Sequence, residues 1–160
     1  ACAERITVLS DGSIPQVEMT TQGLNGQPLK GTGTFPAIIC CNLFNSKTRN
    51  VQGNGHGKSQ PNVTCANNER YIRAIADGTT VGYKYFRFED VKRLKITVRG
   101  SAGRIIVGTT VDHQFVEIPI TRALEWKTYS VDFVLPNGIY PLYFTYKGKG
   151  KIDFLAFELF

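Results

Sequence analysis

The sequence predicts an all-β fold, a β-sandwich (jelly roll) of two antiparallel sheets. Helical periodicity is almost absent, and from residue 70 onward short apolar runs recur at intervals of about 8–12 residues. Turn residues separate these runs, as at Asp77-Gly78 and Pro136-Asn137-Gly138. Many short strands with this spacing are typical of sandwiches and barrels, in which function lies in the loops and on the outer faces.

The expected strands follow in chain order. Residues 6–9 and 14–20 are expected to form two strands around the turn Asp11-Gly12, and 35–44 a further strand. The polar stretch 45–69, rich in glycine and asparagine, predicts a long loop. Eight more strands are then predicted, at 71–76, 80–88, 94–98, 104–111, 115–120, 129–135, 140–146 and 152–160.

Length and composition suit one globular domain. A chain of 160 residues with 42% hydrophobic content can bury a sizeable core, and this content excludes a disordered chain. No apolar run is long enough to span a membrane, so no membrane partner is predicted.

The stretch GNGHGKS, residues 53–59, resembles a phosphate-binding loop but lacks its spacing. That motif needs a glycine five positions before Gly57, where this chain has Gln52. Pro61 also disfavours a helix after Ser59, so the aligned amides that hold a phosphate would be missing. We interpret the stretch as a polar surface loop.

The net charge of +6 is concentrated in one predicted strand. In VKRLKITVRG the basic residues alternate with apolar ones, which predicts one apolar face and one basic face, the latter carrying Arg93, Lys95 and Arg99. This basic face is either solvated or a docking surface. A nucleic-acid partner would want several exposed aromatic residues on the same face, and we count no such stripe, so none is predicted.

Nothing in the sequence marks a catalytic centre. The two histidines, His56 and His113, have no serine or cysteine nearby in a recognisable nucleophile setting. No pair of carboxylates is marked for glycoside hydrolysis. We therefore predict that this chain is not itself an enzyme.

Three segments carry a family resemblance. The C-terminal WKTYSVDFVLPNGIYPLYFTYKGKGKIDFLAFELF resembles the last strands of a family 6 carbohydrate-binding module. The shared elements are a strand containing Trp126, the G-x-x-x-L-x-F pattern of Gly138, Leu142 and Phe144, and a glycine-rich loop before Ile152-Asp153-Phe154. DGTTVGYKYFRFEDVKRLKITVRG resembles the central strands of such modules. DGSIPQVEMTTQGL resembles the junction where such a module follows a family 43 glycoside hydrolase domain.

This resemblance implies a function and a domain organisation. The chain would be the C-terminal module of an enzyme that degrades xylan or arabinoxylan, and it would bind polysaccharide without catalysis. Residues 1–12 would be the remnant of the junction to the preceding catalytic domain, and 13–160 the module. The alternative is a structural module that braces the catalytic domain and binds little or no free sugar.

The resemblance also implies a structural calcium ion. Its ligands would be Gln16 and Glu18, in place of the family's Q/E-A-E run, and Asp153. Residues 16 and 18 would share one face of a strand, and oxygen ligands suit calcium. Asp153 is expected to share a face with Leu155 and Phe157, where an acid needs a partner. The alternative is a solvated Glu18 at a strand end.

The sugar-binding residues implied by the resemblance are Trp126, Lys151 and Tyr71. Family members hold the sugar between two aromatic rings, with an asparagine fixing hydroxyls. Trp126 matches the family's tryptophan and is expected to face outward, Lys151 stands at the asparagine position, and Tyr71 is the closest replacement for the partner tyrosine, whose place falls near Ala74. Lys151 could instead contact an acidic decoration such as a glucuronic acid, or this face could be occupied by the catalytic domain.

Overall fold

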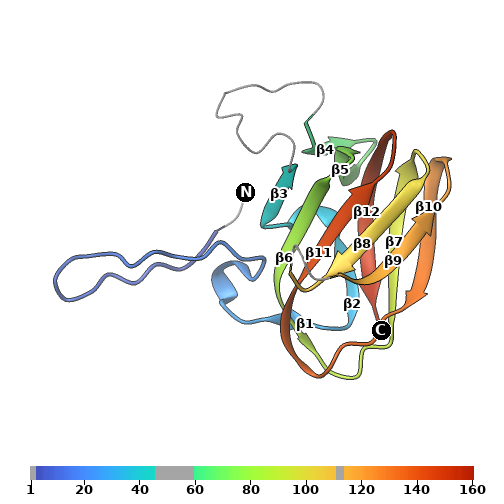
Figure 1. The fold of residues 1–160 in the computed structure, drawn as a ribbon. Helices are drawn as coiled ribbons and strands as arrows, with labels where there is room; N and C mark the ends of the chain where they lie inside the picture. The colour runs from blue at the N-terminus through green and yellow to red at the C-terminus, as the bar shows by residue number, and fades with distance from the viewer. Residues whose placement is uncertain (1–2, 46–59, 111–113) are drawn as a thin grey trace.

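The computed structural model confirms the sandwich of two sheets and describes residues 3–45, 60–110 and 114–160 (Figure 1). Sheet A contains β1 (Leu29–Lys30), β3 (Asn42–Asn45), β6 (Thr79–Phe88), β8 (Gly103–Gly108), β9 (Gln114–Ile120) and β11 (Gly138–Lys147). Sheet B contains β2 (Gly33–Pro36), β4 (Asn62–Ala66), β5 (Glu69–Ala76), β7 (Arg93–Gly100), β10 (Ala123–Asp132) and β12 (Lys151–Leu159). Two short 3-10 helices, η1 (Gly23–Asn25) and η2 (Ala37–Ile39), lie in the first part of the chain.

The strand order fixes which residues become neighbours. Sheet A has the order β1-β6-β11-β8-β9, with β3 beside β1 on the same edge of β6. Sheet B has the order β10-β7-β12-β5-β4, with β2 beside β5 on the same edge of β12. The pairing is antiparallel except for β1, which runs parallel to β6.

Aromatic side chains from both sheets fill the core. Phe157 of β12 stacks on Phe35 at 5.3 Å between ring centroids, and it also contacts Tyr83 at 4.8 Å and Phe144 at 5.1 Å. All but the half-buried Phe35 are at most 2% exposed. Burial of these large apolar side chains is the main force that holds the two sheets together.

The eight strands predicted after residue 70 are confirmed, and the first part of the chain differs. The predicted strand 35–44 is split by η2 into β2 and β3. The predicted loop 45–69 contains β4, because Asn67 and Asn68 both adopt positive φ and form the tight turn of a β4–β5 hairpin. The stretch 53–59 and His113 lie outside the described residues.

Residues 3–20 form what we call the N-terminal arm, which extends away from the sandwich beside β6 and β3 (Figure 1, blue). The turn predicted at Asp11-Gly12 is present, with Gly12 at φ 83° and the Asp11 carboxylate accepting a hydrogen bond from Ser13 N. The strands predicted at 6–9 and 14–20 are not formed, because the two extended limbs pair neither with each other nor with a sheet. Within the described ranges, no helix has the length and hydropathy that a membrane crossing requires.

Candidate functional site

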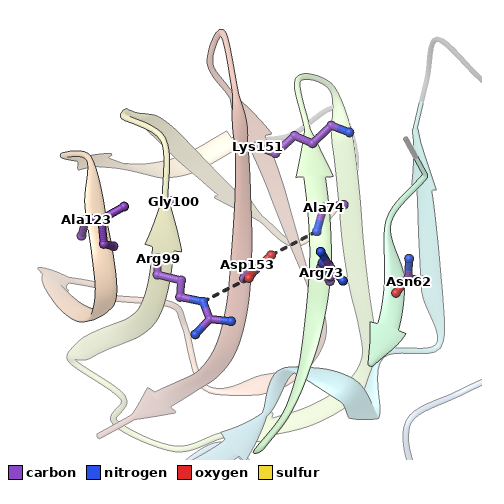
Figure 2. A pocket seen from close by; sticks show the side chains of 9 residues that line it. Asn62, Arg73, Ala74, Arg99, Gly100, Ala123, Lys151 and Asp153 are labelled. Carbon is purple, nitrogen blue, oxygen red and sulfur yellow. Dashed lines mark hydrogen bonds and ion pairs between the residues drawn. The ribbon is translucent and has the colours of Figure 1, made fainter. Parts of the chain in front are cut away.

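A hollow of about 640 Å³ lies on the outer face of sheet B (Figure 2). All five strands of the main sheet order contribute to it or flank it, from β10 across β7, β12 and β5 to β4. Its lining comprises Asn62, Arg73, Ala74, Arg99, Gly100, Ala123, Leu124, Lys151 and Asp153. Three of these side chains are cationic and one is anionic, so the hollow carries an excess of positive charge.

Asp153 lies at the centre of the hollow and is held from both sides. Its Oδ2 accepts a hydrogen bond from Arg99 Nε at 3.1 Å, and its Oδ1 accepts one from the backbone N–H of Ala74 at 3.2 Å (Figure 2). The Arg99 and Asp153 side chains are 27% and 21% exposed, so the ion pair is only partly screened by water. It offers a ligand both hydrogen-bond donors and acceptors at one place.

Two β-bulges determine this geometry. On β5, Arg73 and Ala74 together oppose Asp153, and Ala74 has a left-handed φ of 63°, the conformation found in one common type of bulge. On β12, a second irregularity between Phe154 and Ala156 shifts the alternation of side chains. Asp153 therefore points outward while Phe157 lies in the core, and the prediction that these two residues share a face is wrong.

The structure brings the predicted aromatic pair together around Arg99. The Arg99 guanidinium lies 4.1 Å from the ring centroid of Trp126 and 4.8 Å from that of Tyr71. The two rings meet edge to face, at 5.3 Å and 73°, and Trp126 Nε1 donates a hydrogen bond to Glu69 at 2.8 Å. Trp126 is half-buried on the outer face, whereas Tyr71 is only 5% exposed beneath it. The rings thus contact a cation rather than forming an open slot between parallel faces.

Electrostatics keeps Arg99 charged in this setting. Burial alone lowers the pKa of Arg99, but the hydrogen bond and the charge of Asp153 outweigh it, so the pKa lies above its ordinary value. Lys151 comes from β12 two residues before Asp153 and lines the same hollow. The sequence analysis did not identify Arg73 as a site residue, and it identified Arg99 only as part of a basic strand. The partner of Arg99 depends on the register of the strands, which the sequence alone does not show.

The rest of the basic face of β7 is paired in the same manner. Arg93 contacts Asp132 of β10 at 3.2 Å, and Lys95 contacts Glu158 of β12 at 3.4 Å. Such exposed pairs contribute roughly 0.2–1 kcal/mol each. Arg93 and Lys95 therefore each face a carboxylate on a neighbouring strand, which favours a solvated surface at this end of β7.

The three predicted calcium ligands do not converge. Glu18 lies on the N-terminal arm, where its carboxylate binds Lys84 Nζ at 2.9 Å and Tyr85 OH at 2.9 Å, both on β6 of sheet A. Gln16 is exposed on the same arm, and Asp153 lies on the outer face of sheet B with Arg99 as its partner. Among the described residues, no group of three or more His, Cys, Asp or Glu side chains could hold a metal ion. These residues therefore do not fit a calcium site.

Comparisons with known proteins found one related enzyme sequence and several solved structures of the same fold. No family model matches the sequence. A xylosidase/arabinosidase from Thermoclostridium stercorarium is 38% identical over 168 residues, which cover 99% of this chain and 36% of that protein. The chain thus spans about a third of the length of this relative.

Solved structures with the same fold include isolated modules and a larger enzyme. A family 6 carbohydrate-binding module from Clostridium stercorarium, in complex with cellobiose, matches with a TM-score of 0.66 at 14% identity, over 84% of this chain and 97% of its own. A family 6 module from Clostridium cellulolyticum, in complex with xylose, has a TM-score of 0.64 at 14% identity, over 82% and 98%. A family 43 arabinoxylan arabinofuranohydrolase from Bacillus subtilis, in complex with cellotetraose, has a TM-score of 0.65 at 14% identity, over 98% of this chain and 33% of its own. These matches confirm the resemblance at the level of the fold.

Proposed function

Since this chain has the fold of the family 6 carbohydrate-binding modules and is related to one segment of a xylosidase/arabinosidase, we propose that it is a carbohydrate-binding accessory module. It would belong to a glycoside hydrolase that acts on xylan or arabinoxylan, and it would bind this polysaccharide without cleaving it. The cellobiose and xylose in the solved modules, and the names of the two glycosidases, support this proposal.

The observation that carries the proposal is the hollow on sheet B. It gathers Lys151, Trp126 and Tyr71, the three side chains expected to bind sugar, in or beside a cluster centred on the Arg99–Asp153 pair. A sugar ring lying over this pair can donate hydroxyl hydrogen bonds to the carboxylate and accept them from the guanidinium. Trp126 packs against Arg99, and its exposed part supplies an apolar surface beside that side chain.

The charge of the hollow supports a more specific ligand. Arg73 and Lys151 line it together with Arg99, and only Asp153 opposes them. A xylan that carries glucuronic acid presents a carboxylate, which these cations can bind with charge-assisted hydrogen bonds. We therefore expect acidic xylan to bind more tightly than neutral xylan, and the difference to decrease with salt.

Calcium stays a prediction from the family resemblance, without an assigned ligand set. A rise in melting temperature on adding calcium, reversed by a chelator, would support it, because a ligand that binds only the folded state stabilises that state.

Affinity electrophoresis of the 160-residue chain tests the proposal. Gels containing glucuronoxylan or arabinoxylan are expected to retard the chain, and Lys151→Ala and Trp126→Ala are expected to weaken the retardation. Lys149→Ala is the matched control, because Lys149 is an exposed lysine on the adjacent loop outside the hollow. If no glycan retards the chain, or if only Lys149→Ala reduces retardation, the sheet B hollow is not the binding site.

The alternative function is a structural module that braces the catalytic domain. One observation favours it specifically, namely the apolar N-terminal arm, which projects from the sandwich with its large side chains exposed. The two functions do not exclude each other, because the arm leaves the sandwich beside sheet A while the hollow lies on sheet B.

A further inference from the structure

The N-terminal arm exposes an unusual amount of apolar surface. Six of its large apolar side chains are between 40% and 61% exposed, and these are Ile6, Val8, Leu9, Ile14, Val17 and Met19. Single exposed apolar residues are ordinary. A series of them on one projecting segment indicates a surface that another protein domain or chain covers in the functional protein.

The backbone of the arm is unpaired as well. For residues 3–19 the described structure gives only two backbone–backbone hydrogen bonds, both in the turn, from Leu9 N to Ser13 O and from Gly12 N to Leu9 O. Apolar and polar residues alternate along 5–8 and 16–19, as in strands that have one buried face. Extended segments with free N–H and C=O groups are templates for pairing with the edge of a sheet.

The base of the arm is fixed to the sandwich, so the arm is not a loose tail. Glu4 Oε1 accepts hydrogen bonds from Thr20 N and Thr20 Oγ1, and these bonds join the two limbs at 2.6 and 2.8 Å. Thr21 N donates to Lys84 O, Lys84 N donates to Thr21 Oγ1, and Lys84 Nζ binds Glu18. These contacts hold the arm beside β6 in a defined direction.

The comparisons indicate what covers the arm. The isolated module from Clostridium stercorarium matches 84% of the residues of this chain, whereas the larger family 43 enzyme from Bacillus subtilis matches 98%. A match over 98% leaves only about 3 of the 160 residues without a counterpart, so nearly all of the arm has one in the larger enzyme. The matched segment is only 33% of that enzyme, so most of the enzyme lies outside it.

We propose that the N-terminal arm is a docking hairpin that adds its limbs to a sheet edge of the glycoside hydrolase domain of the same polypeptide, burying its apolar side chains there. This inference rests on the proposed function, because it assumes that such a domain is attached. It extends the junction predicted at residues 1–12 to the whole of residues 3–20, and it gives that junction a structural role.

Hydrogen exchange compares the arm in the 160-residue chain and in the natural full-length polypeptide that contains it. In the 160-residue chain the amides of 5–8 and 16–19 are expected to exchange at rates near those of an unfolded peptide. In the full-length protein they are expected to slow by about a hundredfold or more, because exchange then requires undocking. In the full-length protein, Val8→Asp is expected to abolish this protection, because it places a charge in the docked face.

The matched control is Val134→Asp, at a valine that is 74% exposed on the sandwich, and it is expected to leave the protection of the arm unchanged. Arm amides that exchange equally fast in both proteins would overturn the proposal, as would a natural polypeptide without a glycoside hydrolase domain. The 160-residue chain could instead form a dimer that Val8→Asp dissociates. That result would show that a second copy of the chain covers the arm, and it would also overturn the proposal. Glycan retardation is measured on the same samples, and its persistence in Val8→Asp separates a failure of docking from a failure of the proposed function.

Discussion

At the scale of single residues, Asp153 and Glu18 show how strand partners decide the role of a carboxylate. Both residues were expected to bind one calcium ion, yet each has its own cation, Arg99 for Asp153 and Lys84 for Glu18. The two pairs lie on different sheets, because Lys84 belongs to β6 and Arg99 to β7. Local sequence shows that an acid needs a partner, but only the register of the folded strands shows which partner it has.

The Glu18 contact predicts pH-dependent protection at the base of the arm. The hydrogen bond from Lys84 lowers the pKa of Glu18 below its ordinary value of 4.5. A carboxylate with a lowered pKa in the folded state stabilises that state above the ordinary value, and this contribution is lost as the pH falls through the lowered pKa. At neutral pH we expect Glu18→Gln to reduce the exchange protection of the Thr21 amide a few-fold, since an exposed pair contributes about 1 kcal/mol or less.

The same comparison at acid pH, below 4.5, is expected to show a smaller difference between Glu18→Gln and the unaltered chain, because the carboxylate loses its charge as the pH falls through its lowered pKa. Glu125→Gln, at an exposed glutamate of β10, serves as the control and is expected to have no effect at either pH. A loss of protection in Glu18→Gln that is equally large at both pH values would contradict the electrostatic explanation.

At the scale of elements, the sequence predicted regular strands well and irregular ones poorly. Alternation and turn residues located all eight strands after residue 70, because each has one face in the core. The bulges on β5 and β12 were not predictable, because one extra residue leaves no mark in the alternation of short strands. The N-terminal arm has the pattern of a strand without being one, since a strand requires a pairing partner and none of the described residues pairs with it.

The bulge on β5 predicts opposite behaviour for two alanines of the same strand. Ala74 has a φ of 63°, which is unfavourable for any residue with a Cβ atom, whereas Ala76 is in regular strand pairing with Lys151. Glycine relieves the strain at the first position and only adds flexibility at the second. We expect Ala74→Gly to be more stable than Ala76→Gly by about 1 kcal/mol in urea unfolding. Equal losses of stability in the two variants would show that the bulge is not strained.

At the scale of the whole molecule, the arm and the hollow lie at different sheets. The arm is anchored to β6 of sheet A, and the positively charged hollow is open on the outer face of sheet B. A catalytic domain docked on the arm would therefore leave the hollow available for polysaccharide. The family resemblance predicted a sugar-binding function and the residues Trp126, Lys151 and Tyr71, but it did not predict that Arg99 contacts both rings.

The central claim is that xylan binds on the outer face of sheet B, and an NMR titration tests it most directly. The ¹⁵N-labelled 160-residue chain is titrated with a xylo-oligosaccharide that carries glucuronic acid, and the shifts of its backbone amides are followed. We predict that the largest shifts cluster at Ala74, Gly100 and Lys151, which line the hollow. Shifts confined to other parts of the sandwich, such as the loop at 148–150, or no shifts at saturating sugar, would contradict the claim.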